Sequence, residues 1–169
     1  GIVLQKVGLE RELTVREALV HYGACYSRRR PVDEVLELVG LHGLGDRRTH
    51  RLSGGQKRRI DLALGIIGDP DVLFLDEPTI GLHQSDCRRL IELLHALVDQ
   101  GHTVVVIEHH PDVIAEADWV IEIGPEGGNA GGQLVHAGDP ESLAKLKKSP
   151  TAPSLRLTLE RGLVKKTAG

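Results

Sequence analysis

The stretch Leu52-Ser53-Gly54-Gly55-Gln56 is followed downstream by Val72-Leu73-Phe74-Leu75-Asp76-Glu77-Pro78, and these two segments decide the fold. The first places a hydroxyl and two glycine N–H groups at the start of a helix, where the helix dipole favours an anion. The second is an apolar strand ending in two adjacent carboxylates, which can hold Mg²⁺ and polarise a water molecule beside a phosphate. Together they predict chemistry at a phosphate group.

The bulk properties of the chain exclude several classes of protein. A length of 169 residues is typical of one domain with a sizeable core, and apolar runs such as Val104–Ile107 are too short to span a bilayer. The net charge of −3 gives no global basic field for nucleic acid, and 2% aromatic residues argue against base stacking. Cys25 and Cys87 form no CxxC motif, which favours reduced thiols and predicts a cytoplasmic setting.

The N-terminal part of the chain carries helix signals. Residues 1–5 are typical of the end of a strand. Thr14-Val15-Arg16-Glu17 is a capping box, and Pro31 suits the first position of a helix that runs to Val39. Ser53-Gly54-Gly55-Gln56 is a second capping-box pattern, and apolar residues recur on one face of the helix that it opens. We therefore expect a mostly helical lobe over residues 6–69.

The remainder of the chain alternates strands and helices, which predicts an α/β fold with a mostly parallel sheet flanked by helices. Apolar runs indicate buried strands, and leucines at helical spacing indicate an amphipathic helix between the first two of them. The expected elements are strands at Val72–Leu75, Val104–Ile107, Trp119–Ile123 and Leu134–Ala137, and helices over 85–99 and Pro111–Ala117.

Both deciding segments also have plainer interpretations. Ser53-Gly54-Gly55-Gln56 alone could be an ordinary capped helix, and Asp76 with Glu77 could be a solvated strand end. However, two consecutive glycines after the cap lower helix propensity while letting a phosphate approach the backbone. Adjacent carboxylates after an apolar strand are costly unless a cation or a water molecule uses them. The combination favours the functional interpretation.

In order and spacing, the two segments resemble the signature and Walker B motifs of ATP-binding cassette (ABC) ATPases. The resemblance implies a partial P-loop NTPase fold of the ABC type, with ATP and Mg²⁺ as cofactors. It implies that Asp76 helps to hold Mg²⁺ through water and that Glu77 is the general base for the attacking water. The signature residues that would contact the γ-phosphate of ATP bound mainly to a partner subunit are Ser53, Gly54, Gly55 and Gln56.

Further residues take roles from the same resemblance. Gln5, at the end of the first strand, resembles the Q-loop glutamine that reaches Mg²⁺ and the attacking water. His109 follows Val106-Ile107-Glu108 and resembles the switch histidine that touches the γ-phosphate, with His110 as the alternative. Thr79–His83 resembles the D-loop that crosses to the partner subunit. The family also implies a head-to-tail dimer with a second ABC domain, which encloses two ATP molecules.

The P-loop motif G-x-x-x-x-G-K-[ST] is missing, since the sequence contains no Gly-Lys pair. In the family this motif lies upstream of the Q-loop glutamine and supplies the largest share of nucleotide affinity. We therefore expect residues 1–162 to be a truncated ABC domain that binds ATP weakly or not at all in isolation. Its expected parts are a helical signature lobe over about 6–69, an α/β core over 70–140 and a basic C-terminal tail over 145–169.

The likeness to ABC proteins divides along the chain. One set of segments comprises Val3-Leu4-Gln5, Glu12–Glu17, Pro31–Val35 and Leu52–Arg59. With these, residues 1–79 resemble the ATPase subunit of daunorubicin-type drug exporters. A second set comprises Ile80–Gln84, Val105–His109, Ala117–Val120, Gly124–Gly128 and Ser149–Ala152. With these, residues 80–162 resemble the C-terminal end of UvrA, the damage-sensing ATPase of nucleotide excision repair.

Two features depart from the UvrA pattern. UvrA signatures usually have a glutamate where this chain has Gln56, and the zinc-bound cysteine modules of UvrA are absent from the sequence. Two explanations of this divided likeness are open. The chain is either a natural or artificial hybrid of the two families or a divergent member between them.

Three functions are open from the sequence. Because the lobe before the signature resembles exporters, we expect foremost a drug-exporter ATP-binding subunit that couples ATP hydrolysis to transport. It would bind a transmembrane permease and lie peripherally at the inner face of the membrane. The alternative is a UvrA-type excinuclease ATPase, with DNA and repair proteins as partners. The third is a non-catalytic fragment that supplies its signature motif in trans.

Overall fold

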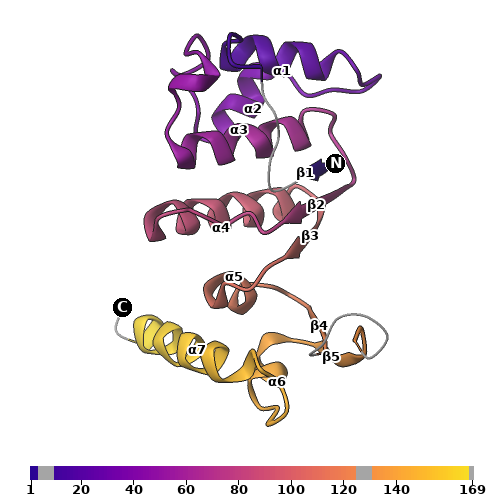
Figure 1. Cartoon of the computed structure of the whole chain (residues 1–169), viewed down its shortest axis with the longest axis vertical. Helices are drawn as coiled ribbons and strands as arrows, with labels where there is room; N and C mark the ends of the chain where they lie inside the picture. The colour runs from indigo at the N-terminus through magenta and orange to yellow at the C-terminus, as the bar shows by residue number, and fades with distance from the viewer. Residues whose placement is uncertain (4–9, 125–130, 168–169) are drawn as a thin grey trace. The chain divides into compact units, whose positions relative to one another are not determined.

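The structure is a computed structural model that describes residues 1–3, 10–124 and 131–167. The chain forms two compact units, Gly1–Ile107 and Glu108–Gly169 (Figure 1). The boundary between the units falls directly after the third strand, Thr103–Ile107. Among the described residues, no helix combines the length and the apolar character that crossing a membrane requires.

Helices form most of the first half of the first unit. Both capping boxes that the sequence predicts are confirmed: the Thr14 Oγ1 accepts the Glu17 N–H at 3.2 Å, and the Ser53 Oγ accepts the Gln56 N–H at the same distance. Each glutamate or glutamine side chain accepts the N–H of its cap residue in return. The helices are α1 (Val15–Gly23), α2 (Val32–Leu38), the 3₁₀ helix η1 (Thr49–Arg51) and α3 (Gly54–Ile66).

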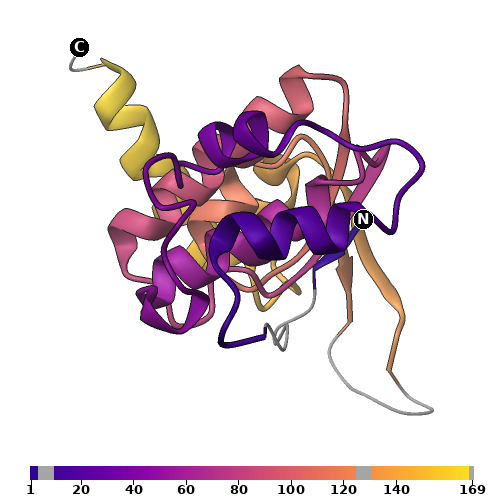
Figure 2. The same ribbon diagram turned by 90° about the horizontal axis from the view of Figure 1, so that it is seen from above.

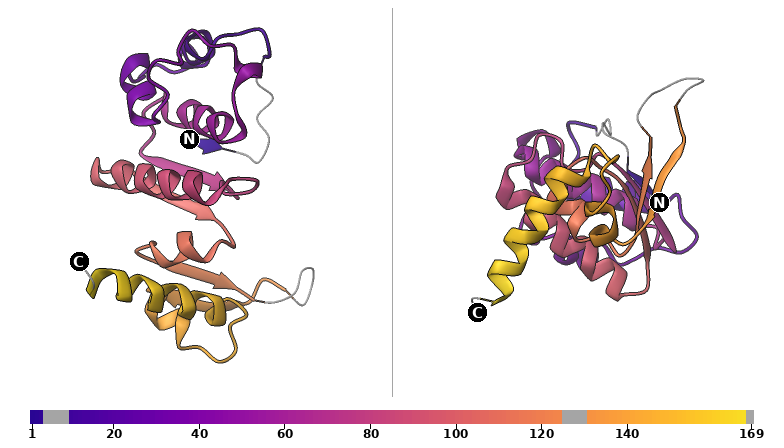
Figure 3. Two further views of the ribbon diagram at one scale, coloured as in Figure 1. Left: turned by 90° about the vertical axis from the view of Figure 1, so that its left-hand side faces the viewer. Right: turned by 90° about the horizontal axis from the view of Figure 1, so that it is seen from below.

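Three parallel strands form a sheet next to the helical lobe. They are β1 (Ile2–Val3), β2 (Val72–Asp76) and β3 (Thr103–Ile107), and β2 lies between the other two. The amphipathic helix α4 (Gln84–Asp99) connects β2 to β3 and lies alongside these strands (Figure 3, left). Helix α3 packs against β1, where Gly65 has no side chain and so lets Val3 and Leu73 approach closely.

The two faces of this sheet differ in exposure. On the inner face Val3, Leu73 and Leu75 are buried in a core that they share with α1, α3 and α4. On the outer face Ile2, Phe74 and Val105 stand side by side in register, with 69%, 48% and 39% of their surface exposed. Parallel sheets in proteins are normally covered on both faces. Figure 2 shows the first unit from above, with α1 nearest the viewer.

The second unit has a small core of its own, built around Leu143, Ala144 and Leu155. Where the sequence predicts a basic tail, the structure has helix α7, because Leu155 is fully buried and the Ser149 Oγ accepts the Ala152 N–H at 3.0 Å. The two strands of the second unit pair antiparallel with each other. The elements of this unit are α5 (Pro111–Ala115), β4 (Val120–Ile123), β5 (Leu134–Gly138), α6 (Pro140–Ala144) and α7 (Ala152–Thr167).

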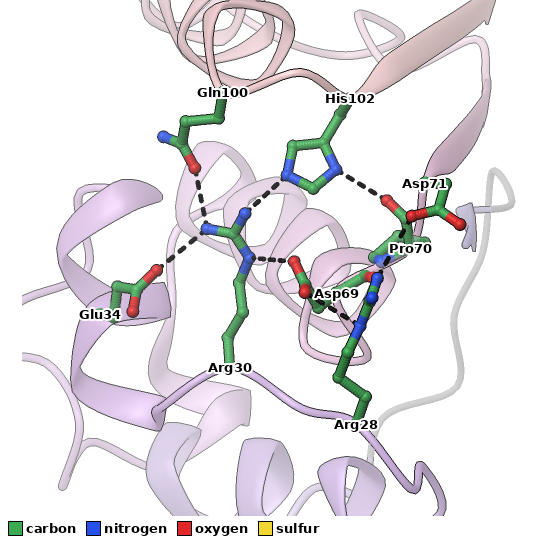
Figure 4. Close-up of polar contacts among 8 residues, drawn as sticks. All are labelled: Arg28, Arg30, Glu34, Asp69, Pro70, Asp71, Gln100 and His102. Atoms are coloured by element: carbon green, nitrogen blue, oxygen red, sulfur yellow. Dashed lines mark hydrogen bonds and ion pairs between the residues drawn. The ribbon is translucent and has the colours of Figure 1, made fainter.

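A polar cluster around Arg30 joins three turns of the first unit (Figure 4). The side chain is only 11% exposed, and its Nε donates to Asp69 Oδ1 at 3.0 Å. Its Nη1 donates to Glu34 at 3.0 Å and to Gln100 at 2.9 Å, and its Nη2 donates to His102 Nε2 at 2.6 Å. His102 Nδ1 lies 2.7 Å from the Pro70 carbonyl, which only accepts, so Nδ1 is the donor in this contact and Nε2 accepts from Arg30. Arg30 therefore ties the loop before α2 to the turns after α3 and α4.

We expect Arg30→Ala to lower the free energy of unfolding by about 2–3 kcal/mol, because the nearly buried Arg30 side chain is lost and the half-buried Asp69 and His102 lose a charged donor. Urea denaturation followed by circular dichroism measures this loss. The matched control is Arg29→Ala, which removes the same charge from an exposed neighbouring position and should change stability by less than about 0.5 kcal/mol. Equal losses in the two variants would contradict a structural role for the cluster.

Candidate phosphate and water-activation site

The N-terminus of α3 presents the predicted signature residues to solvent. Ser53 and Gly54 are exposed, and Gly55 and Gln56 are half-buried. The capping box engages Ser53 with Gln56 in both directions, at 2.9 and 3.2 Å. The N–H groups of Gly54 and Gly55 belong to the first turn, which has no intrahelical acceptors. Together with the helix dipole, these groups make the end of α3 suitable for an anion such as a phosphate.

The two glycines differ in their surroundings. A Cβ at Gly54 would meet no atom within 4 Å, whereas a Cβ at Gly55 would lie 2.6 Å from Asp86 Oδ2. A side chain at the second glycine would therefore displace the Asp86 carboxylate of α4, whereas the first glycine faces open space. Arg59 reinforces this packing, because its Nη2 lies 3.7 Å from Asp86 Oδ1 and its Nη1 donates to the Gly40 carbonyl at 3.0 Å.

The predicted carboxylates lie at the carboxyl end of β2. Asp76 ends the strand, Glu77 follows it, and both are half-buried. Glu77 has a φ of +44°, in the left-handed region that non-glycine residues rarely adopt. Its N–H donates to the Ile107 carbonyl at 2.9 Å, and its carbonyl accepts from Arg58 Nη2 at 3.0 Å and from the Ile80 N–H at 3.3 Å. Helix α3 is therefore hydrogen-bonded directly to the backbone of Glu77 through the Arg58 side chain.

The residues at the end of β2 could hold Mg²⁺ only together with water and the phosphates of a bound nucleotide. Among the described residues there is no group of three or more His, Cys, Asp or Glu side chains that could hold a metal ion. Mg²⁺ commonly takes one or two carboxylates and completes its shell with water and substrate phosphates. The half-buried Asp76 at a strand end could be such a ligand, so the fit depends on a nucleotide being bound.

The other predicted site residues lie elsewhere. Gln5 falls outside the described residues, so its predicted role stays a prediction. His109 belongs to the second unit, where it is exposed and its N–H donates to Glu108 Oε2 at 2.8 Å. His110 begins α5, and its Nδ1 accepts the Asp112 N–H at 3.3 Å. This contact uses the His110 side chain as a cap, and His109 stays the predicted switch histidine with His110 as the alternative.

Sequence analysis misses three polar residues that shape the first unit around α3. They are Arg58, Asp61 and Asp86, whose contacts depend on tertiary packing. Asp61 is 8% exposed and lies one turn from Arg58, with 3.9 Å between its Oδ2 and Arg58 Nη1. Burial raises the pKa of Asp61 to about 6, against a smaller lowering by Arg58. The only sequence signal is a carboxylate amid the apolar run that follows the signature.

Comparison with known proteins gives this site a context. Residues 1–80 match the protein-family model described as ABC transporter. Over 154 residues, or 89% of this chain, the sequence is 44% identical to UvrABC system protein A of Mesorhizobium japonicum. The protein of the same name from Pasteurella multocida is also 44% identical, over 155 residues. The chain spans 16% of the length of these relatives.

Solved structures agree with this similarity. UvrA2 from Deinococcus radiodurans is 40% identical with a TM-score of 0.62, over 88% of this chain and 18% of that one. A dimeric bacterial ABC transporter cassette is 26% identical with a TM-score of 0.62, over 72% of this chain and 56% of that one. A metal-chelate type ABC transporter, in an inward-facing conformation, is 25% identical with a TM-score of 0.63, over 72% of this chain and 53% of that one.

These findings confirm the α/β fold of the ABC type and the resemblance to ABC ATPases and to UvrA. They also extend one likeness beyond the residues for which the sequence predicts it. The alignment with UvrA proteins covers 89% of the chain, so it is not confined to residues 80–162. The relatives therefore favour the UvrA alternative over the drug-exporter interpretation that the sequence put first.

Asp61 generates a prediction about pH. Its raised pKa means that the folded chain holds a proton more tightly than the unfolded chain, so stability falls as pH rises from about 4 to about 6. Asp61→Asn, which cannot ionise, should therefore gain about 1–3 kcal/mol relative to wild type between pH 4 and pH 7.5. Urea denaturation at both pH values measures the difference. Asp99→Asn, at an exposed position, should show no such gain, and a pH-independent Asp61→Asn effect would contradict the prediction.

Proposed function

The chain carries part of an ABC ATPase domain, and on that premise we propose that it is the signature and Walker B segment of a UvrA-type repair ATPase. The observation that carries this proposal is the 44% identity to UvrA proteins, since it extends over 89% of the chain and therefore includes both the signature and the Walker B strand. The activity and partners of the whole protein belong to the proposal, because the chain spans 16% of these relatives.

Export is the second candidate. It is supported by the match of residues 1–80 to the family described as ABC transporter and by the 25% identity to a metal-chelate type ABC transporter. That identity is lower and extends over 72% of the chain, which is why we rank export after repair. ATP chemistry is common to both functions, so the residue roles below hold for either.

In the proposed mechanism, α3 recognises the γ-phosphate of ATP. The Ser53 hydroxyl and the N–H groups of Gly54 and Gly55 would donate to phosphate oxygens, with the helix dipole adding to the attraction. Asp76 would hold Mg²⁺ through water, and the ion would supply charge neutralisation at the phosphates when bound. Glu77 would accept a proton from the attacking water. Gln5 and His109 would contact the water and the γ-phosphate, as their family counterparts do.

A second ABC domain is the proposed partner. The α3 N-terminus is exposed, so it can reach a nucleotide held by another subunit in a head-to-tail dimer. The similarity to a dimeric ABC transporter cassette supports this arrangement. For the repair function the further partners would be DNA and repair proteins, and for export a transmembrane permease.

The phosphate site predicts a specific effect of Gly54→Ala. Because the new Cβ meets open space, the fold should persist, but the methyl group should obstruct the approach of a phosphate to the backbone. Titration of ATP and Mg²⁺ to millimolar concentration should shift the amide resonances of the first turn of α3 in the wild type and several-fold less in the variant. Gly162→Ala, also without neighbours within 4 Å, is the control. Shifts at α3 as large in Gly54→Ala as in the wild type would refute the phosphate site.

Duplex DNA binding tests the choice between repair and export. For a repair ATPase we expect an affinity that falls linearly on a logarithmic scale as salt rises from about 50 to 200 mM, because phosphate contacts release counterions. Fluorescence anisotropy with a labelled duplex measures the affinity and its salt dependence. No measurable DNA binding, together with co-purification of a polytopic membrane protein, would favour export instead.

A further inference from the structure

Glu77 holds a backbone conformation that its residue type disfavours. Its φ is +44°, whereas side chains with a Cβ are crowded in the left-handed region. Such a conformation persists only where the surrounding structure imposes it, and it recurs at functional sites. The question is therefore which contacts impose it.

Three hydrogen bonds fix the peptide groups on either side of Glu77. The Glu77 N–H donates to the carbonyl of Ile107, at the end of the neighbouring strand, at 2.9 Å. The Glu77 carbonyl accepts the Ile80 N–H at 3.3 Å, which closes a local turn. The same carbonyl accepts from Arg58 Nη2 at 3.0 Å, and this contact alone of the three comes from a side chain.

Arg58 is itself held in place. Its side chain is 12% exposed, and its Nη1 lies 3.9 Å from Asp61 Oδ2, one turn further along α3, which is close enough for charge attraction. A guanidinium is planar and rigid, so fixing one of its nitrogens restricts the direction of the others. A charged donor also makes a stronger hydrogen bond than a neutral one. The contact with the Glu77 carbonyl is therefore directed as well as strong.

We propose that Arg58 is a positioning residue that holds Glu77 in its left-handed conformation and so sets the direction of the Glu77 carboxylate. The catalytic part of this inference rests on the proposed function, in which Glu77 accepts the proton of the attacking water. Arg58 lies two residues after Gln56 in α3. A phosphate bound at Ser53–Gln56 and the carboxylate at Glu77 are thereby linked through a single turn of helix and one side chain.

Backbone amide exchange, measured by NMR, tests the positioning directly. In Arg58→Ala we expect the Glu77 N–H to exchange about tenfold faster or more, because the turn that presents it to Ile107 loses its strongest tie. Arg58→Lys keeps a charged donor and should restore part of the protection. The Thr103 N–H, which donates to the Asp71 carbonyl at 2.9 Å, serves as an internal reference for global unfolding. Arg88→Ala removes an exposed charge from α4 and should change neither amide.

Kinetics separate this inference from the proposed function. If the chain hydrolyses ATP, Arg58→Ala should lower kcat about tenfold with KM unchanged, and Arg58→Lys should recover part of kcat. If Glu77→Gln hydrolyses ATP as fast as the wild type, the catalytic role of Glu77 fails, whereas the exchange result still decides whether Arg58 holds it. Unchanged protection and unchanged carbon chemical shifts of Glu77 in Arg58→Ala would overturn the inference.

Discussion

The pairing of β2 with a parallel strand on each side is the constraint on which the first unit depends. Phe74 pairs with Ile2 on one side and with Val105 on the other, so the backbone groups of β2 are satisfied by its neighbours. The inner side chains of β2 anchor α3 and α4 through a shared core. Because the strand is fixed along its length, the carboxylates at its end occupy a defined place.

Helix α3 joins the helical lobe to this sheet, and it contributes to both parts of the candidate site, the phosphate-binding turn and the strand end that carries Glu77. Its first turn offers backbone donors, its second turn supplies Arg58 to the Glu77 carbonyl, and its last turns pack Gly65 against Val3. Arg59 adds contacts to Gly40 and Asp86 from the same helix. A displacement of α3 would therefore change its contacts with the helical lobe, with α4 and with the end of β2 at the same time.

Local patterns explain what could be predicted from the sequence. The capping boxes at Thr14 and Ser53 involve residues three apart, and the strands are short apolar runs, so neither needs tertiary information. The contact of Arg58 with Glu77 spans 19 positions and exists only once α3 lies beside β2. Asp61 is buried for the same reason, although a carboxylate on a helix is usually exposed. The likeness of the first half to exporters placed export first, whereas the relatives favour the UvrA alternative, because the predicted signature and Walker B motifs are common to both families.

The exposed row of Ile2, Phe74 and Val105 has a consequence for the behaviour of the protein in solution. Apolar groups that stand together in water are poorly solvated. Salts such as sulfate are excluded from protein surfaces and raise the free energy of exposing these groups to water. Sulfate and warming should therefore drive these surfaces together, and low concentrations of urea should disperse them before they unfold the core. The outer face of this sheet therefore adds an apolar contribution to solubility that the net charge of −3 does not describe.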